Sequence, residues 1–200
     1  MTRFVLVLAF VAAAVTACTS EKSASAPTPL PPGPSEAQLV AKAGLDPCPA
    51  TQALPEAGKS LPDLTLACLG TGPEVHLSGL RGRPTVLNIW GSWCTPCQRE
   101  TRYFAEVYDQ AKTKVRFLGV DTEDDPKSAL DFAAHVSPRM RYPQVVDNSK
   151  KLLIALRLPS AVPTTVFVSA AGDVVKVSPG PYTSSASLRS AIQRYLGVSA

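Results

Sequence analysis

The chain has 200 residues, of which 45% are hydrophobic and 18% charged, and its formal net charge at pH 7 is +4. This supplies enough apolar material for one ordinary domain with flanking segments. The small net charge and the lack of a basic cluster argue against nucleic acid as a partner. The chain has five cysteines. In an exported protein, where cysteines pair in disulfides, an odd number leaves one cysteine with a different role.

Residues 1–17 predict a signal peptide. Arg3 is followed by an apolar run that ends at Val15, well short of the ~20 residues of a membrane-spanning helix. The letters Val-Thr-Ala directly before Cys18 resemble the lipobox of bacterial lipoproteins, in which the peptide is cut before a cysteine that then carries diacylglycerol. Residues 18–34, rich in Ser, Ala and Pro, are then a linker on the outer face of the bacterial cell membrane. An ordinary signal peptide or an uncleaved anchor is the alternative, and each places the domain outside the cytoplasm.

Residues 35–60 predict an N-terminal extension. Ser35 is placed to cap a short helix that runs through Ala43 and ends at the following glycine. Outside the cytoplasm, Cys48 and Cys68 are expected to form a structural disulfide. It closes a loop of about 20 residues, for a stabilisation on the order of 3 kcal/mol. Two buried free thiols are the alternative.

Residues 61–200 alternate between strand and helix patterns, which predicts an α/β domain with a central mixed sheet flanked by helices. The predicted strands are 61–66, 75–77, 85–90, 115–121, 142–146, 161–168 and 174–177. The predicted helices are 97–112, 125–136, 150–156 and 184–196. Helix 125–136 is expected to bury Ala129, Phe132, Ala133 and Val136 on one face. Strands 85–90 and 115–121 form a parallel pair, because a helix crosses between them.

Two cysteines follow the strand 85–90 in the run Trp-Gly-Ser-Trp-Cys-Thr-Pro-Cys. The spacing puts Cys94 at the start of a helix, where unpaired backbone N–H groups favour a thiolate. We expect Cys94 to be the nucleophile and the shielded Cys97 to resolve the mixed disulfide, so that the two form a redox-active disulfide. Pro96 shapes the first helical turn. Trp93 is expected to border the site, and Trp90 to pack in the core.

The order of elements, with a Cys-x-x-Cys at a helix start and a Val-Pro-Thr entry to a later strand, resembles the thioredoxin superfamily. The closer resemblance is to its extracytoplasmic TlpA/ResA/CcmG (DsbE)-like branch. Three features carry it: an N-terminal β-hairpin extension, a central helix–strand insertion at about 125–146, and Glu100 three residues after the second cysteine.

The resemblance implies roles for further residues. Pro163 would be a cis proline against the site, which leaves the backbone of Val162 able to pair with an extended substrate. Thioredoxin has a buried aspartate where this chain has Asn88, which cannot act as a base, so Glu100 would supply part of that proton transfer. A carboxylate near the helix start also complements the macrodipole without any catalytic role.

The resemblance implies a thiol-disulfide oxidoreductase that keeps exported protein thiols, such as those of apocytochrome c, reduced by reducing their disulfides. A membrane electron donor of the CcdA/DsbD type would recharge it. The alternatives are an oxidase that forms disulfides, and a tethered binding module in which the Cys-x-x-Cys is structural. A peroxidase of the peroxiredoxin type is disfavoured by the letters Gly-Ser-Trp-Cys. No cofactor is expected, and no metal, because His76 and His135 lack ligand companions.

Overall fold

The computed structural model describes residues 33–55 and 58–200, and the predicted signal peptide, Cys18 and nearly all of the linker lie outside the described residues. Residues 34–200 group into one compact unit, so that the predicted extension 35–60 packs with the rest. Within the described ranges, no helix is both long and apolar enough to cross a bilayer.

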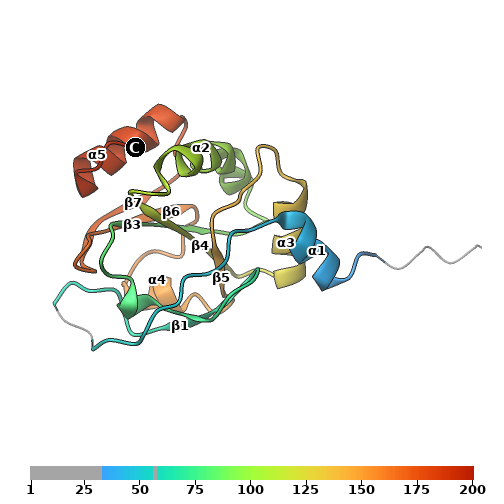
Figure 1. Cartoon of the computed structure of the whole chain (residues 1–200), viewed down its shortest axis with the longest axis horizontal. Coiled ribbons are helices and arrows are strands. Elements are labelled where there is room, and N and C mark those ends of the chain that lie inside the picture. The colour runs from blue at the N-terminus through green and yellow to red at the C-terminus, as the bar shows by residue number, and fades with distance from the viewer. Residues whose placement is uncertain (1–32, 56–57) are drawn as a thin grey trace, which may run out of the picture. The chain divides into compact units, whose positions relative to one another are not determined.

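The core of the unit is a seven-stranded mixed sheet with the strand order β2-β1-β5-β4-β3-β6-β7 (Figure 1). The strands are β1 (Thr65–Cys68), β2 (Val75–His76), β3 (Thr85–Trp90), β4 (Arg116–Thr122), β5 (Gln144–Asp147), β6 (Thr164–Val168) and β7 (Val174–Pro179). Strands β3, β4 and β5 are parallel, and the other neighbouring pairs are antiparallel. The carboxyl ends of β3, β4 and β5 therefore meet at one edge of the sheet, where the site lies.

Helices cover both faces of this sheet. They are α1 (Glu36–Ala43), α2 (Thr95–Ala111), α3 (Pro126–His135), α4 (Lys151–Ala155) and α5 (Ser185–Leu196), with a short 3-10 turn at Leu77–Gly79. Apolar residues of α1, α2, α3 and α5 share one core with Val86 and Trp90 of β3. Residues of α4 and the hairpin share the other core with Leu87 and Ile89. Because both faces of β3 are covered, its residues are all buried, as its apolar run predicts.

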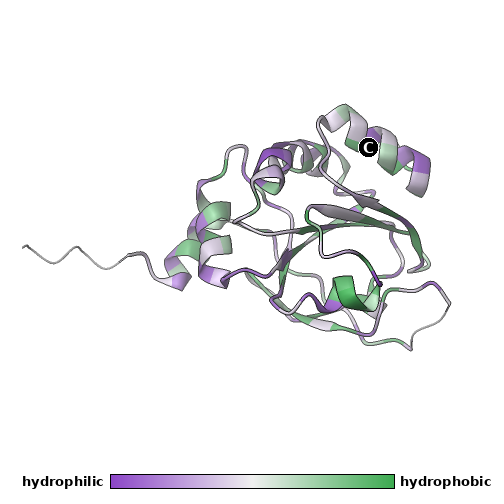
Figure 2. Ribbon diagram, turned by 180° about the vertical axis from the view of Figure 1, so that it is seen from behind, coloured by the Kyte–Doolittle hydropathy of each residue, from purple (hydrophilic) through white to green (hydrophobic). Residues whose placement is uncertain are grey.

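The coloring by hydropathy in Figure 2 follows this layering. The short helix α4 is mostly hydrophobic, whereas α2 and α5 carry hydrophilic stretches on the sides turned away from the sheet. The spacing of α5 aligns Leu188, Ile192 and Leu196 on one face. Leu188 and Ile192 are buried, whereas Leu196 at the end of the helix is only half-buried.

The predicted α/β architecture with a mixed sheet is confirmed, and the differences lie at element ends. The first predicted strand, 61–66, starts only at Thr65, because Leu61 instead donates its backbone N–H to Gly172. Helix α2 begins at Thr95 rather than Cys97, because Cys94 takes the capping position and proline is tolerated in a first turn. The predicted buried face of α3 is half right: Ala129 and Ala133 are buried, but Phe132 and Val136 are only half-buried, and Val136 follows the end of the helix. Leu130 and Ala134 are buried instead, since α1 packs against this helix.

Glycine is required at position 119 by a neighbouring side chain. Gln144 reaches across from β5, and its Oε1 accepts a hydrogen bond from Nε1 of Trp90 at 2.9 Å. A Cβ on Gly119 would lie 1.6 Å from that Oε1. The missing side chain thus lets Gln144 satisfy the buried indole of Trp90.

The predicted Cys48–Cys68 disulfide is present, with a Cα–Cα distance of 6.0 Å and a sequence separation of 20. Cys68 ends β1 and lies opposite Val145 of β5. The bridge therefore fastens the segment after α1 to the sheet.

Replacing both Cys48 and Cys68 with alanine is expected to lower the free energy of unfolding by about 3 kcal/mol, because the unfolded chain regains the freedom of a closed loop. Urea titration measures this as a lower midpoint, with a slope that does not decrease, because the unfolded chain without the bridge is less compact. A midpoint within error of the wild type would show that the bridge adds no stability.

Candidate active site

The two cysteines of the Cys-x-x-Cys lie at the start of α2 and are joined as a disulfide, with a Cα–Cα distance of 5.2 Å. Cys94 is the N-cap residue, with extended backbone angles, and its Sγ accepts a hydrogen bond from the backbone N–H of Cys97 at 3.2 Å. After reduction the same N–H would stabilise a thiolate on Cys94, in addition to the partial positive charge of the helix end.

The surroundings of the disulfide differ on its two sides. Cys97 is 1% exposed and Cys94 4%, so that the second sulfur is the better shielded. Trp93 is 53% exposed and borders the disulfide, whereas Trp90 is 1% exposed and lies in the core. The exposed surface at this disulfide is therefore that of Trp93.

The turn before Cys94 is held by side chains from two other elements. The N–H of Ser92 donates to Oδ2 of Asp124 at 2.5 Å, and Nε2 of Gln98 donates to the carbonyl of Ser92 at 2.5 Å. A Cβ on Gly91 would lie 2.5 Å from Nε1 of Trp93, so glycine lets the indole fold back over the turn. These contacts fix the start of α2 and therefore the position of Cys94.

The loop before β6 lies against Cys94. The peptide bond between Val162 and Pro163 is cis, and the carbonyl oxygen of Val162 is 3.7 Å from Sγ of Cys94. Pro163 is buried, and its own carbonyl accepts from the N–H of Gly180. The structure thus brings Val162, Pro163 and the disulfide together, although they are about 70 residues apart.

Glu100 lies one turn beyond Cys97 and is 1% exposed. Its Oε1 accepts from Nδ2 of Asn88 at 2.8 Å, and its Oε2 from the backbone N–H of Tyr182 at 3.0 Å. Burial raises the pKa of Glu100 to about 7, against the lowering effect of these two hydrogen bonds. Helix α2 starts at Thr95, which puts Glu100 in the second turn and not in the first, where a carboxylate complements the dipole.

A buried hydrogen-bond chain extends from Glu100 into the core. Asn88, which holds Glu100, accepts from the hydroxyl of Tyr142 at 3.1 Å through its Oδ1. Because Asn88 uses both ends of its amide, it fixes the orientation of the Glu100 carboxylate. The role of Asn88 was not foreseen from the sequence, since its partners lie 12 and 54 residues away.

Asp121 is a second buried carboxyl, at the carboxyl end of β4 beside Trp90. Among the described residues, its two oxygens make no hydrogen bond of good geometry. Burial, followed by the nearby charge of Asp124, raises its pKa to about 8. Asp121 was not among the predicted site residues, although an acidic residue at the end of an apolar strand next to the Cys-x-x-Cys strand was a usable signal.

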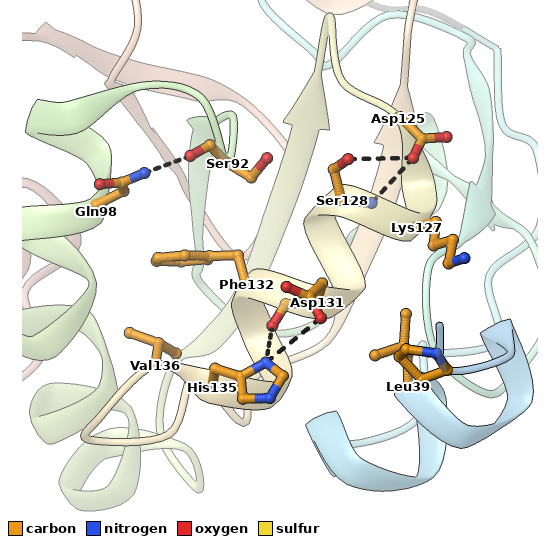
Figure 3. Close-up of a pocket in the computed structure, with 11 residues that line it drawn as sticks. Leu39, Ser92, Gln98, Asp125, Lys127, Ser128, Asp131, Phe132, His135 and Val136 are labelled. Atoms are coloured by element: carbon orange, nitrogen blue, oxygen red, sulfur yellow. Dashed lines mark hydrogen bonds and ion pairs between the residues drawn. The ribbon is translucent and has the colours of Figure 1, made fainter. Parts of the chain in front are cut away.

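Two cavities flank the start of α2, with Gln98 and Val136 on the border of both. One, of about 590 Å³, lies between α1, α3 and the turn at Ser92. Figure 3 shows this cavity: Phe132 and His135 of α3 lie between Gln98 of α2 and Leu39 of α1. The other, of about 390 Å³, lies between α2 and the loops at 136–137 and 181–183.

The described residues hold no cluster of three or more side chains suited to a metal ion. His76 contacts Oγ1 of Thr65 in the hairpin, and His135 lies beside Asp131 on α3. Neither histidine lies with the two cysteines. The disulfide between Cys94 and Cys97 at the start of α2, with an N–H donated to Sγ of Cys94, is a geometry suited to thiol–disulfide exchange.

Comparison with known proteins agrees with this chemistry. A family model described as Redoxin matches residues 56–192. The chain is 34% identical over 127 residues to the thiol-disulfide oxidoreductase ResA of Geobacillus kaustophilus, which covers 63% of this chain and 71% of the relative.

Solved structures show the same fold. DsbF of MTB matches with a TM-score of 0.60 and 23% identity, over 70% of this chain and 99% of that one. A DsbF homologue from Corynebacterium diphtheriae matches with a TM-score of 0.58 and 25% identity, over 72% of this chain and 91% of that one. The predicted thioredoxin-like fold is thereby confirmed.

Proposed function

Because the chain belongs to the redoxin family and is a thiol-disulfide oxidoreductase of the ResA type, we propose that it acts through Cys94 and Cys97 as a reductase of exported proteins. The observation that carries this is the position of Cys94. It caps α2, receives an N–H from Cys97, and lies between the exposed Trp93 and the carbonyl of Val162.

The reaction begins with both cysteines reduced. The thiolate of Cys94 attacks one sulfur of a partner disulfide, forms a mixed disulfide and releases the partner's other sulfur as a thiolate, which takes up a proton. Cys97 then loses its proton and attacks Sγ of Cys94, which releases the partner as a dithiol. Two electrons pass to the partner, and the enzyme is left with the Cys94–Cys97 disulfide.

Glu100 is the group we assign to the proton of Cys97. It is buried one turn along the same helix, and its pKa of about 7 lets it both hold and release a proton near neutral pH. Asn88 positions this carboxyl and exchanges no proton itself.

The natural substrate in this proposal is an exported protein with a cysteine pair, such as apocytochrome c, and the electron donor is a membrane protein of the CcdA/DsbD type. The resemblance of the active-site run to the extracytoplasmic thioredoxin-like branch supports both. The letters before Cys18 support a lipid anchor at that residue, which intact-mass measurement of the membrane fraction would detect as a diacylglycerol adduct.

Insulin reduction tests the enzymatic proposal. The purified protein is expected to accelerate the precipitation of insulin by dithiothreitol, and a rate equal to that of dithiothreitol alone would leave the Cys-x-x-Cys as a structural element of a binding module. Equilibration with glutathione then gives the reduction potential, which distinguishes a reductase from an oxidase. A potential near the thioredoxin value of about −270 mV supports a reductase, and one near the DsbA value of about −120 mV an oxidase.

Trapping identifies the substrate. In a Cys97→Ala variant the mixed disulfide on Cys94 has no resolving thiol, so the partner should stay attached and be released by reductant. Recovery of apocytochrome c would support the maturation role, and recovery of a broad set of exported proteins would replace it with general disulfide handling.

A further inference from the structure

The smaller cavity beside α2 is positively charged, and this charge has no role in the proposed mechanism. Arg99 and Arg102 line it, one helical turn apart, and both are exposed. No acidic side chain lines the cavity, and within the part of the chain that the structure describes neither arginine forms an ion pair. Glu106, which follows Arg102 by four residues, instead accepts a hydrogen bond from the hydroxyl of Ser185.

The walls of the cavity suit an extended peptide. The guanidinium of Arg102 lies over the ring of Tyr103, 4.6 Å from the centroid, and donates to the hydroxyl of the same residue at 2.5 Å. This contact holds Arg102 in place and leaves further N–H groups for a ligand, since a guanidinium has five. Tyr182 adds a second aromatic wall, and Thr183 a hydroxyl group.

The cavity borders the Cys-x-x-Cys segment. Pro96, which lies between the two cysteines, is part of its lining. Tyr182, on the opposite wall, donates its backbone N–H to Glu100. A chain that fills the cavity therefore touches Pro96 of the Cys-x-x-Cys and Tyr182, which holds the proposed proton-transfer group.

We propose that the Arg99/Arg102 cavity binds a carboxylate side chain of the partner protein, in a segment that flanks the cysteine attacked by Cys94. The inference rests on the proposed function and names a feature of its substrates: they carry Asp or Glu close to the reacting cysteine. Arginine is suited to this task because its planar N–H groups match the two oxygens of a carboxylate.

Peptide selectivity tests the proposal on the oxidised full-length protein. Three dithiol peptides share one sequence except for two residues that flank the cysteines: glutamate, glutamine or lysine. Reduction of the Cys94–Cys97 disulfide is followed in acid-quenched samples by chromatography. In 20 mM salt the glutamate peptide is expected to react about tenfold faster than the lysine peptide, and in 500 mM salt the ratio should fall toward one.

Variants locate the effect. In the double variant Arg99→Gln, Arg102→Gln, the ratio of the rate for the glutamate peptide to the rate for the lysine peptide is expected to drop to about one. Arg194→Gln, an exposed arginine near the end of α5, is the matched control and should keep the wild-type ratio. Equal rates for the three peptides, a preference for lysine, or a ratio that survives in the double variant would overturn the inference. Failure of every peptide and of dithiothreitol to exchange with the protein would instead overturn the proposed function.

Discussion

Replacement of Cys94 with serine is expected to reduce the rate of insulin reduction to that of dithiothreitol alone. The hydroxyl of serine does not ionise near neutral pH and forms no disulfide, so neither the attack nor the mixed disulfide takes place. Cys97 is not expected to take over, because it is 1% exposed and lies within the first turn of α2. The expected loss is complete, not partial.

Two controls separate lost chemistry from lost structure. The double variant Cys48→Ala, Cys68→Ala keeps the Cys-x-x-Cys and should retain the wild-type rate at a temperature where it is folded. The melting temperature of Cys94→Ser should match that of the reduced wild type, since Ser can replace Cys94 as the N-cap of α2. A Cys94→Ser protein that still reduces insulin at the wild-type rate would contradict the proposed nucleophile.

The second large effect is a loss of stability on going from acid to neutral pH, caused by Glu100. Its pKa is about 7 in the folded chain and about 4.5 for an ordinary glutamate. Between these values the unfolded chain loses the proton while the folded chain keeps it, so that stability falls as pH rises. The drop is on the order of 3 kcal/mol, complete above pH 7 and absent below pH 4.5.

Urea midpoints at several pH values measure this drop in the wild type and in Glu100→Gln. The variant should show a smaller decline, together with a constant offset because glutamine cannot accept from both Asn88 and Tyr182. Asp121, with its pKa near 8, acts in the same direction, so Asp121→Asn is the matched second variant. Parallel curves for wild type and Glu100→Gln would show that Glu100 is ionised in the folded state at acid pH.

The same variant tests the proton-transfer role. The wild-type exchange rate should change around pH 7 as Glu100 titrates, and the Glu100→Gln profile should lack that step. A step of unchanged position and size would assign the titration to another group and leave Glu100 with a structural role.

Much of the fold was predictable because its central elements have strong local patterns. The run at β3 is apolar without interruption, and α5 repeats its apolar residues at helical spacing. Element ends depend on single contacts that periodicity does not encode. The start of α2 was placed two residues late, because only the backbone angles of Cys94 reveal it as the N-cap.

The site was predictable where the chemistry is local and not where it joins distant segments. Two cysteines three residues apart at a helix start already predict a redox pair. The partners of Glu100 come from β3 and from the loop at Tyr182, 12 and 82 residues away, and no local pattern links them. The cavity at Arg99 and Arg102 was likewise not predictable, because the rest of its lining comes from loops at 136–137 and 181–183.

The position of Trp93 also gives the protein a built-in optical signal. The chain has only two tryptophans, and both lie within four residues of Cys94 in sequence. A disulfide quenches the fluorescence of a nearby indole, and Trp93 directly precedes Cys94, which forms one. The intrinsic emission of the whole protein should therefore brighten on reduction, so that its redox state can be followed in real time without any label.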